Sequence, residues 1–273
     1  MSAPATRFAV SPFPERTPQS RTIRTAACLI IGDEILNGKT QDTNSHYFAK
    51  FCFGLGIDLK RIEVIADDEK EIIEASRRLV SQFDLVVTSG GIGPTHDDIT
   101  YESLAKAFGQ ELKYHEETQH RMGEMSKHRS DLDNQTEAQN IARLRMTLFP
   151  ADAEVLFVAE DLWVPVVRLE KKLCILPGVP SIFKRLLEGL KPYALLPDSA
   201  DKLFRLLVRT EMAESLIAPF LTDLSIRVKP EGIRIGSYPE FRKNVTVSLV
   251  GKDVERLRRL GEEQEMHRNG HLP

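Results

Sequence analysis

Short apolar runs alternate with amphipathic stretches through the first 110 residues, and this alternation constrains the fold more than any other feature of the sequence. The apolar runs cover 26–31, 57–65 and 85–88, and the amphipathic stretches cover 43–55, 68–80 and 101–108. Runs this short and this apolar are typical of strands buried on both faces. Because strands that alternate with helices form parallel βαβ units, we expect an α/β fold, a three-layer sandwich with a mostly parallel sheet.

The rest of the chain divides into a continuation of this unit and a smaller unit. The continuation contains two helical patches, a hairpin and a third helix, expected at 116–127, 137–145, 164–176 and from Ser181 onward. A linker over 191–201 precedes strands and helices expected at 203–208, 213–224, 233–237, 245–250 and 254–265. We therefore predict a main domain over 25–195 and a small α+β domain over 200–266. Residues 1–24, which are rich in Pro, Ser, Thr and Arg, are expected to be a disordered extension.

Composition excludes several classes of protein. Lys and Arg number 37 against 40 Asp and Glu, a net charge of -3, so we expect no nucleic-acid partner held by bulk charge. No apolar run approaches the roughly 20 residues that cross a bilayer, so no membrane span is expected. Cys28, Cys52 and Cys174 lack metal-ligand spacing and are expected to be small buried residues in a reducing compartment. We expect a cytoplasmic protein, with the nucleus also open; the arginines of residues 1–24 make mitochondrial import the alternative, although four prolines there oppose the amphipathic helix that import needs.

Two segments come close to known motifs without matching them. The stretch 32–40 reads GDEILNGKT, but a phosphate-binding P-loop has four residues between its glycines and this stretch has five, two of them acidic. His115 and His120 are five residues apart, whereas the paired histidines of a zinc protease helix are four apart. Neither segment therefore predicts a nucleotide or zinc site.

The segment 88–98, which reads TSGGIGPTHDD, carries the strongest local signal for chemistry. It follows a predicted parallel strand, and open α/β sheets bind ligands at the carboxyl ends of their strands. Gly90, Gly91 and Gly93 allow close approach of the backbone to a ligand, and the next helix directs its positive end to the same place. Both features favour a phosphate group.

Carboxylates gather at the same predicted edge of the sheet. Asp97 and Asp98 end the glycine-rich loop, Asp33 and Glu34 follow the first strand, and Asp67 follows the second. Oxygen ligands of this kind suit a magnesium-type ion that bridges a phosphate. A simpler interpretation also stands for part of the set, because Asp97 and Asp98 precede a helix and Asp is a common N-cap. For His96, an exposed loop histidine is favoured over a general acid or base.

Several motifs in combination resemble one family. GDE at 32–34, TQDTN at 40–44, GGIGPTHDDIT at 90–100, LPGVP at 176–180 and GSYP at 236–239 together resemble the MoaB/MogA-like molybdopterin-binding domain. The match is longer for the CinA-type branch, whose loop reads GGxGPTxDD. It is longer still for the amino-terminal domain of animal-type FAD synthases, and it also extends to the stand-alone fungal FAD pyrophosphatases. No counterpart of the FAD synthase catalytic half, with its SGGKDS-type loop, occurs in these 273 residues.

The resemblance implies roles for particular residues. The implied catalytic residues are Asp98, Asp97 and His96, and the implied metal ligands are Asp33, Glu34 and Asp98. The implied substrate-binding residues are Gly90, Gly91, Gly93, Pro94, Thr95, Asn44, Asp67, Gly178 and Pro180. Members of the molybdopterin branch carry Arg-Asp where this loop has His-Asp-Asp, which puts molybdopterin adenylylation in doubt.

The function implied by the resemblance is a metal-dependent nucleotide pyrophosphatase that hydrolyses FAD to FMN and AMP. The implied cofactors are a divalent metal, Mg, Mn or Co, with K⁺, and the implied assembly is a homo-oligomer, either a dimer or a trimer. Two alternatives stay open. One is a pyrophosphatase for ADP-ribose or another dinucleotide, and the other is a protein that binds molybdopterin or a flavin without turnover.

Overall fold

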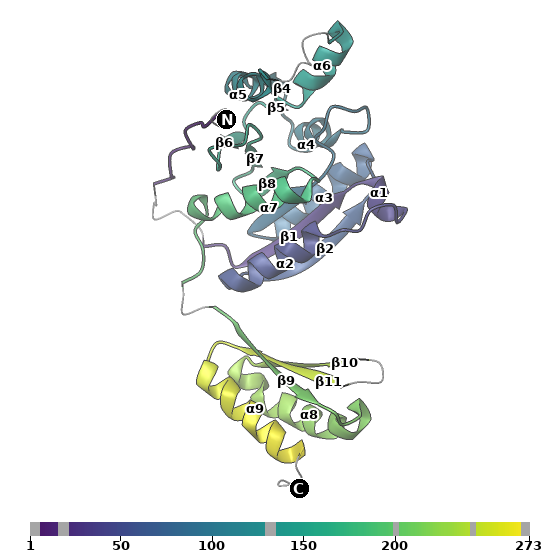
Figure 1. The fold of residues 1–273 in the computed structure, drawn as a ribbon, viewed down its shortest axis with the longest axis vertical. Coiled ribbons are helices and arrows are strands. Elements are labelled where there is room, and N and C mark those ends of the chain that lie inside the picture. The colour runs from purple at the N-terminus through teal and green to yellow at the C-terminus, as the bar shows by residue number, and fades with distance from the viewer. Residues whose placement is uncertain (1–5, 16–21, 129–134, 199–201, 241–243, 269–273) are drawn as a thin grey trace. The chain divides into compact units, whose positions relative to one another are not determined.

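The chain folds into two compact units, Met1–Pro197 and Asp198–Pro273, each with its own apolar core (Figure 1). The structure is a computed structural model that describes residues 6–15, 22–128, 135–198, 202–240 and 244–268.

A six-stranded sheet forms the centre of the first unit. Its strands are β1 (Thr25–Ile31), β2 (Asp58–Ile65), β3 (Leu85–Ser89), β6 (Glu154–Leu156), β7 (Val166–Leu169) and β8 (Leu173–Leu176). The spatial order is β2-β1-β3-β8-β7-β6. The first four strands in this order run parallel, whereas β7 and β6 are antiparallel to their neighbours. The expected mostly parallel sheet is thereby confirmed.

Helices cover both faces of this sheet. The described helices of this unit are α1 (Asp33–Leu36), α2 (Asn44–Leu55), α3 (Glu69–Gln82), α4 (Thr100–Ala107), α5 (Glu116–Ser126), α6 (Glu137–Arg145) and α7 (Pro180–Gly189), with a 3-10 turn at Lys191–Tyr193, and α2, α7, α3 and α4 are the ones that cover the sheet. Alternate residues of β1 enter two separate cores. Cys28 packs with α2 and α7, and Leu29 packs with α3 and α4. This arrangement gives the three expected layers, because a strand presents successive side chains to opposite faces.

The sequence predicted one of two small β-structures in this unit, the β7–β8 hairpin, and did not predict the other, a short two-stranded sheet. The expected hairpin forms between β7 and β8, and Glu170 and Lys171, the central residues of the turn that the Lys172 amide closes on the Leu169 carbonyl, both have positive φ, as a type I′ turn requires. A second, two-stranded sheet of β4 (Leu112–Tyr114) and β5 (Leu148–Pro150) was not expected. Three-residue strands carry too little periodicity for the sequence to reveal them.

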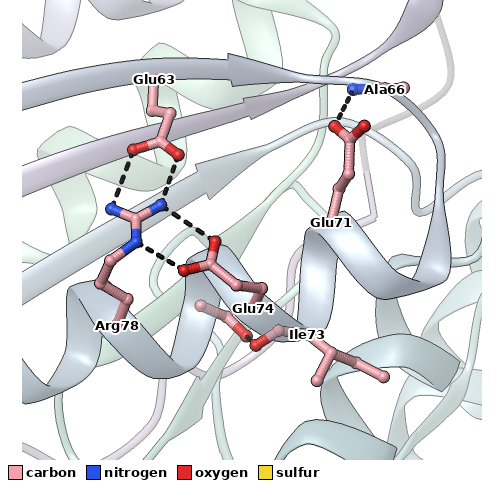
Figure 2. Close-up of polar contacts among 7 residues, drawn as sticks. Glu63, Ala66, Glu71, Ile73, Glu74 and Arg78 are labelled. Atoms are coloured by element: carbon pink, nitrogen blue, oxygen red, sulfur yellow. Dashed lines mark hydrogen bonds and ion pairs between the residues drawn. The ribbon is translucent and has the colours of Figure 1, made fainter.

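Arg78 ties α3 to the edge strand β2. Its guanidinium donates two hydrogen bonds to Glu63 of β2, at 3.2 and 2.6 Å, and two to Glu74 of its own helix, at 2.7 and 3.1 Å (Figure 2). The Glu71 carboxylate accepts a longer bond of 3.4 Å from the backbone amide of Ala66. Arg78 therefore holds α3 against β2, and the Glu71–Ala66 bond spans the connection that carries Asp67.

The amino-terminal segment departs from expectation. Residues 6–15, placed by sequence in a disordered extension, instead lie against the first unit. The Ser11 amide donates to the Phe157 carbonyl at 2.8 Å, and the Tyr193 hydroxyl donates to the Ser11 carbonyl at 2.6 Å. These hydrogen bonds and the packing of Phe13 on the Tyr193 ring offset part of the conformational entropy that is lost when the segment is ordered. The parts of the extension outside the described residues are 1–5 and 16–21.

The second unit is a three-stranded antiparallel sheet with two helices. Its elements are β9 (Phe204–Thr210), α8 (Glu214–Val228), a 3-10 turn at Lys229–Glu231, β10 (Arg234–Pro239), β11 (Val245–Gly251) and α9 (Val254–Arg268). The strands lie in the order β10-β11-β9. Both helices pack on one face of the sheet, where their apolar side chains meet Val245, Val247 and Leu249 of β11 (Figure 1).

No helix in the described ranges has the length and apolar character needed to cross a membrane. Cys28, Cys52 and Cys174 are all buried and free of disulfides, as expected. Burial raises the pKa of the Cys52 and Cys174 thiols to about 12, which makes them unreactive packing residues.

His115 makes the stability of the first unit sensitive to acid. It caps α5, and its Nδ1 accepts a hydrogen bond of 3.2 Å from the Thr118 amide, which requires the ring to be unprotonated at that atom. Burial lowers the pKa of His115 below its usual value of about 6.5. The unfolded chain therefore takes up this proton more readily than the folded chain. Stability contributed by the neutral cap is present above about pH 6.5 and is lost as the pH falls through the lowered pKa.

We predict that His115→Asn reduces this acid sensitivity. Asparagine is a good N-cap whose side-chain oxygen does not titrate, so the drop in Tm between pH 7.5 and pH 5.5 should be smaller in the variant than in the parent chain. Thermal unfolding followed by circular dichroism at both pH values measures the difference. Equal drops in the two proteins would remove His115 as the source.

Candidate functional site

Gly90 brings three parallel strands together at one edge of the main sheet. It follows β3, and its amide donates to the Leu176 carbonyl at the end of β8 at 3.2 Å. Its φ is +112°, and a Cβ at this position would lie 2.0 Å from the carbonyl oxygen of Ile31, the last residue of β1. The backbone approaches β1 so closely that a side chain has no room, which is the physical reason for glycine here.

Gly91 closes the loop onto the start of α4. Its φ is +63°, and a Cβ would lie 2.2 Å from Oγ1 of Thr100, the first residue of the helix. The Thr100 hydroxyl donates to the Gly90 carbonyl at 3.1 Å, and the Thr100 amide donates to the Gly91 carbonyl at 2.9 Å. The loop is thus shaped by hydrogen bonds to α4 rather than by its own glycines alone.

This loop geometry leaves a row of backbone donors available. The amides of Gly91, Ile92 and Gly93 make no hydrogen bond to any residue in the described parts of the chain. Helix α4 begins at the end of the same loop, and Ile99 at its N-cap provides no side-chain hydrogen bond. Successive backbone amides next to a helix N-terminus form an anion-binding concavity.

Asp98 stabilises the second half of the loop. Its Oδ2 accepts hydrogen bonds from the Thr95 amide at 2.9 Å and from the Thr95 hydroxyl at 2.5 Å. The same oxygen would lie only 2.6 Å from a Cβ on Gly93, which is too close for a side chain at that position. This turn leaves Pro94, His96 and Asp97 exposed at its outer side. One oxygen of Asp98 therefore shapes the loop, and only the other, Oδ1, is left for a ligand.

Arg145 is a residue of the site that sequence reasoning missed. From the last turn of α6 it donates to the Thr95 carbonyl and the Asp98 carbonyl, both at 3.1 Å, and to the Glu102 carboxylate at 2.9 Å. One guanidinium thus connects the loop to α4. A basic residue in the last turn of a helix is ordinary, because it complements the helix dipole, so no local pattern singled it out.

The carboxylates that follow β1 and β2 are near one another. Asp67 Oδ2 accepts a hydrogen bond from the Asp33 amide at 3.0 Å. Burial raises the pKa of Asp67 above its ordinary value, and the negative charges of Asp33, Glu34 and Asp97 raise it further, against the opposing effect of the Asp33 amide. A cation bound among these groups would relieve that repulsion.

The described residues contain no group of three or more His, Cys, Asp or Glu side chains positioned to hold a metal ion. The expected ligand set Asp33, Glu34 and Asp98 is therefore not assembled in advance. Instead Thr95 holds the Asp98 carboxylate, and Asp67, which the resemblance placed among substrate-binding residues, contacts Asp33. The donor set still fits Mg²⁺, which typically binds through one or two carboxylates together with substrate phosphates and water.

Asn44 connects the glycine-rich loop to the PGVP turn on the other side of the site. It is buried at the start of α2, and its Nδ2 donates to Ser89 Oγ at 2.9 Å and to the Gly178 carbonyl at 2.8 Å. Its Oδ1 is buried without a partner in the described structure. A Cβ on Gly178 would stand 3.5 Å from Gly90 Cα, so the two loops lie in contact. Pro180 then begins α7.

The chain belongs to the family described as the probable molybdopterin binding domain, whose model matches residues 27–196. The solved structure of the protein CinA from Thermoplasma acidophilum is similar at 31% identity and a TM-score of 0.53, and the match covers 62% of this chain and 96% of that one. The expected MoaB/MogA-like, CinA-type family is thereby confirmed.

Two curated relatives have about the same level of identity. A protein named probable FAD synthase from Caenorhabditis elegans is 34% identical over 239 residues, which cover 83% of this chain and 46% of the relative. A protein of Pyrococcus horikoshii is 35% identical over 240 residues, which cover 84% of this chain and 90% of the relative. The chain thus spans less than half the length of the FAD synthase relative.

We predict that Gly90→Ala destabilises the first unit far more than Gly38→Ala. Both glycines have positive φ, but a Cβ on Gly38 meets no atom within 4 Å. Gly38→Ala should therefore cost only the backbone strain, about 1–2 kcal/mol. Gly90→Ala adds a collision with the Ile31 carbonyl and should cost about 3 kcal/mol or more, or prevent folding.

Urea denaturation of the two variants beside the parent chain measures both costs. Equal free energies of unfolding for the two variants would mean that the loop can move away from β1 at little cost.

Proposed function

We propose that the chain hydrolyses the phosphoanhydride bond of a dinucleotide, and specifically FAD to FMN and AMP. The observation that carries the proposal is the row of amides at Gly91, Ile92 and Gly93, which have no hydrogen-bond partner among the described residues, beside the neighbouring residues Asp33 and Asp67. Donors for phosphate oxygens next to ligands for a cation are what a diphosphate requires. The FAD synthase name of the Caenorhabditis elegans relative supports a flavin dinucleotide as the substrate.

The reaction balances with water as the only co-substrate. A water oxygen adds to one phosphorus while the bridging P–O bond breaks, and the bridging oxygen leaves with the other phosphate. The water protons are released as the two phosphate products ionise. A general base accelerates the addition, and we assign this role to the Oδ1 oxygen of Asp98 or to exposed Asp97. His96, in the same exposed turn, is a candidate to protonate the leaving phosphate.

Residues of this chain would hold the diphosphate and its metal. The amides of the glycine-rich loop would bind phosphate oxygens, and Thr95 and Asp98 would keep the loop in shape. Asp33, Glu34 and Asp67 would hold a divalent cation, Mg, Mn or Co, which when bound neutralises charge on the diphosphate. K⁺ and a homo-oligomeric assembly, both implied by the family resemblance, belong to the proposal as well.

A non-catalytic protein is the second candidate. The family description as a probable molybdopterin binding domain favours a protein that holds its ligand without turnover. A pyrophosphatase for ADP-ribose or another dinucleotide would use the same site and chemistry on a different substrate. A product assay distinguishes both from FAD hydrolysis. The binding protein yields no product, and the other pyrophosphatase yields the products of a different dinucleotide.

We predict that the purified chain converts FAD to equal amounts of FMN and AMP when a divalent metal and K⁺ are present. Chelator should abolish the reaction, and Asp98→Asn and Asp67→Asn should each lower kcat/KM by about 100-fold or more, because each removes a charge that the reaction uses. Chromatographic separation of products, with ADP-ribose and NADH run in parallel, measures the activity.

Asp152→Asn is the matched control, since Asp152 is an exposed aspartate in the turn before β6. It should keep the full rate. Cleavage of ADP-ribose alone would correct the substrate, whereas tight binding of FAD or molybdopterin with no product from any dinucleotide would contradict hydrolysis and favour the binding protein.

Arg145 provides a separate prediction, as a positioning residue that acts through the loop. Arg145→Lys keeps the charge, but a single ammonium cannot span Thr95, Asp98 and Glu102 as the guanidinium fork does. We expect KM for FAD to rise about tenfold, because the loop amides lose their fixed arrangement. Arg143→Lys, in the same helical turn, should leave KM unchanged, and an equal effect of both substitutions would exclude the loop as the cause.

A further inference from the structure

The sheet of the second unit has one covered face and one uncovered face. Its core residues, among them Val247 and Leu249, point toward α8 and α9. The alternate positions point the other way, and those on the edge strands are well exposed, including Leu207 at 57% and Tyr238 at 62%, whereas Ser248 and Val250 of the central strand are buried among their neighbours. Neither described helix of the second unit packs on this side (Figure 1).

The strand register arranges the uncovered face in three rows. Reading across β10, β11 and β9, the rows are Tyr238-Thr246-Arg209, Gly236-Ser248-Leu207 and Arg234-Val250-Arg205. These nine positions include three arginines and no acidic residue. Neighbouring strands lie about 4.8 Å apart, so each row spans about 10 Å, the scale of one nucleotide rather than of a large partner.

Tyr238 forms a flat aromatic platform in this face. A Cβ on Gly236 would stand 3.1 Å from the Tyr238 hydroxyl oxygen and 3.3 Å from a ring carbon, so the ring lies across the glycine. The glycine gives the ring room to lie close to the backbone, and the high exposure of Tyr238 leaves its outer side open to solvent. An exposed aromatic ring supported from below is a stacking surface for a planar heterocycle.

Charge is unevenly distributed along the same face. Beyond the Tyr238 row, β10 is followed by Glu240, and Glu211 follows β9. At the opposite end lie Arg205 and Arg234, and Lys252 comes directly after β11. Among the described residues beyond the Tyr238 row, positive charge therefore lies on the side of Arg205 and Arg234, whereas Arg209 lies in the row of the ring itself.

We propose that this face binds a nucleotide, with its ring stacked on Tyr238 and its phosphate held by Arg205 and Arg234. The inference concerns the second unit and does not rest on the proposed hydrolysis in the first. Each of these arginines already has an interaction within the chain, and a guanidinium has five N–H donors, enough to serve a phosphate as well.

A single nucleotide fits this face better than a nucleic-acid strand. Proteins that bind single strands place successive bases on several aromatic side chains, whereas Tyr238 is the one aromatic residue among the nine positions. The three cationic groups at one end suit one or two phosphates. A continuous backbone would also have to pass Glu211 and Glu240.

The experiment titrates FMN and AMP into the deuterated, ¹⁵N-labelled full chain, with chelator present so that no metal-dependent turnover occurs. Backbone amide shifts of Gly236, Thr246 and Ser248 report this face, and those of Gly91 and Gly93 report the first unit separately. We expect saturable shifts of the β10 and β11 amides with both ligands. Shifts confined to the loop of the first unit, or none at all, would overturn the proposal without bearing on the hydrolysis of FAD.

Substitution of Tyr238 tests the platform. Tyr238→Ala should weaken binding at the β10 and β11 amides by about tenfold or more, and Tyr238→Phe should retain it, because stacking needs the ring and not the hydroxyl. Tyr114→Ala is the matched control, since Tyr114 is a strand tyrosine of the first unit that is 50% exposed. Unchanged binding in Tyr238→Ala would contradict stacking.

A second comparison tests the phosphate end. The pair Arg205→Gln and Arg234→Gln should weaken FMN binding by about tenfold while leaving riboflavin, which has no phosphate, unaffected. Arg258→Gln, at an exposed arginine of α9, is the control. Equal losses for FMN and riboflavin would contradict a phosphate contact.

Two further outcomes would each replace the proposed occupant. An eight-nucleotide single strand that binds at least tenfold more tightly than AMP at the same amides would assign the face to nucleic acid. A dimer in sedimentation that becomes a monomer in Tyr238→Ala would assign the face to a second copy of the chain.

Discussion

The close approach of Gly90 to the end of β1 is the constraint on which the candidate site depends. Because the space of a side chain is taken by the Ile31 carbonyl, the glycine-rich loop lies directly between the ends of β1 and β8. From there it can reach Thr100 at the start of α4 and contact Gly178 on the opposite side. A loop displaced outward by one methyl group would lose these contacts together, and with them the row of aligned amides.

The same packing gives the acidic residues their electrostatic character. Asp67 is desolvated because the β2–α3 connection folds against the loop and α1, and its pKa rises as Asp33, Glu34 and Asp97 approach. The free energy of this repulsion must be offset by the rest of the first unit, including the ties of Arg78 to β2 and of Asn44 to Gly178.

The two sheets differ in how many of their faces are covered by helices. The main sheet is covered on both faces, as a parallel sheet requires, and the candidate site lies at the ends of its strands. The small antiparallel sheet has no helix of its own unit on one face, where Tyr238 lies on Gly236 and two of the three arginines, Arg205 and Arg234, lie in the row at one end. An antiparallel sheet tolerates this exposure because its outward residues alternate with the inward apolar ones along each strand.

Sequence by itself predicted the main strands and helices and singled out one candidate loop. Apolar runs such as 26–31 indicated strands, and TSGGIGPTHDD indicated a candidate phosphate-binding loop, because both patterns depend on residues adjacent in the chain. Tertiary structure decided which groups meet: Asp67 with Asp33, Arg145 with Thr95, and Ser11 with Phe157. These partners are 34 or more residues apart in the chain, and the sequence around a single Arg or Asp does not show which partner it will contact. Their contacts follow from how helices and loops pack, which no local periodicity encodes.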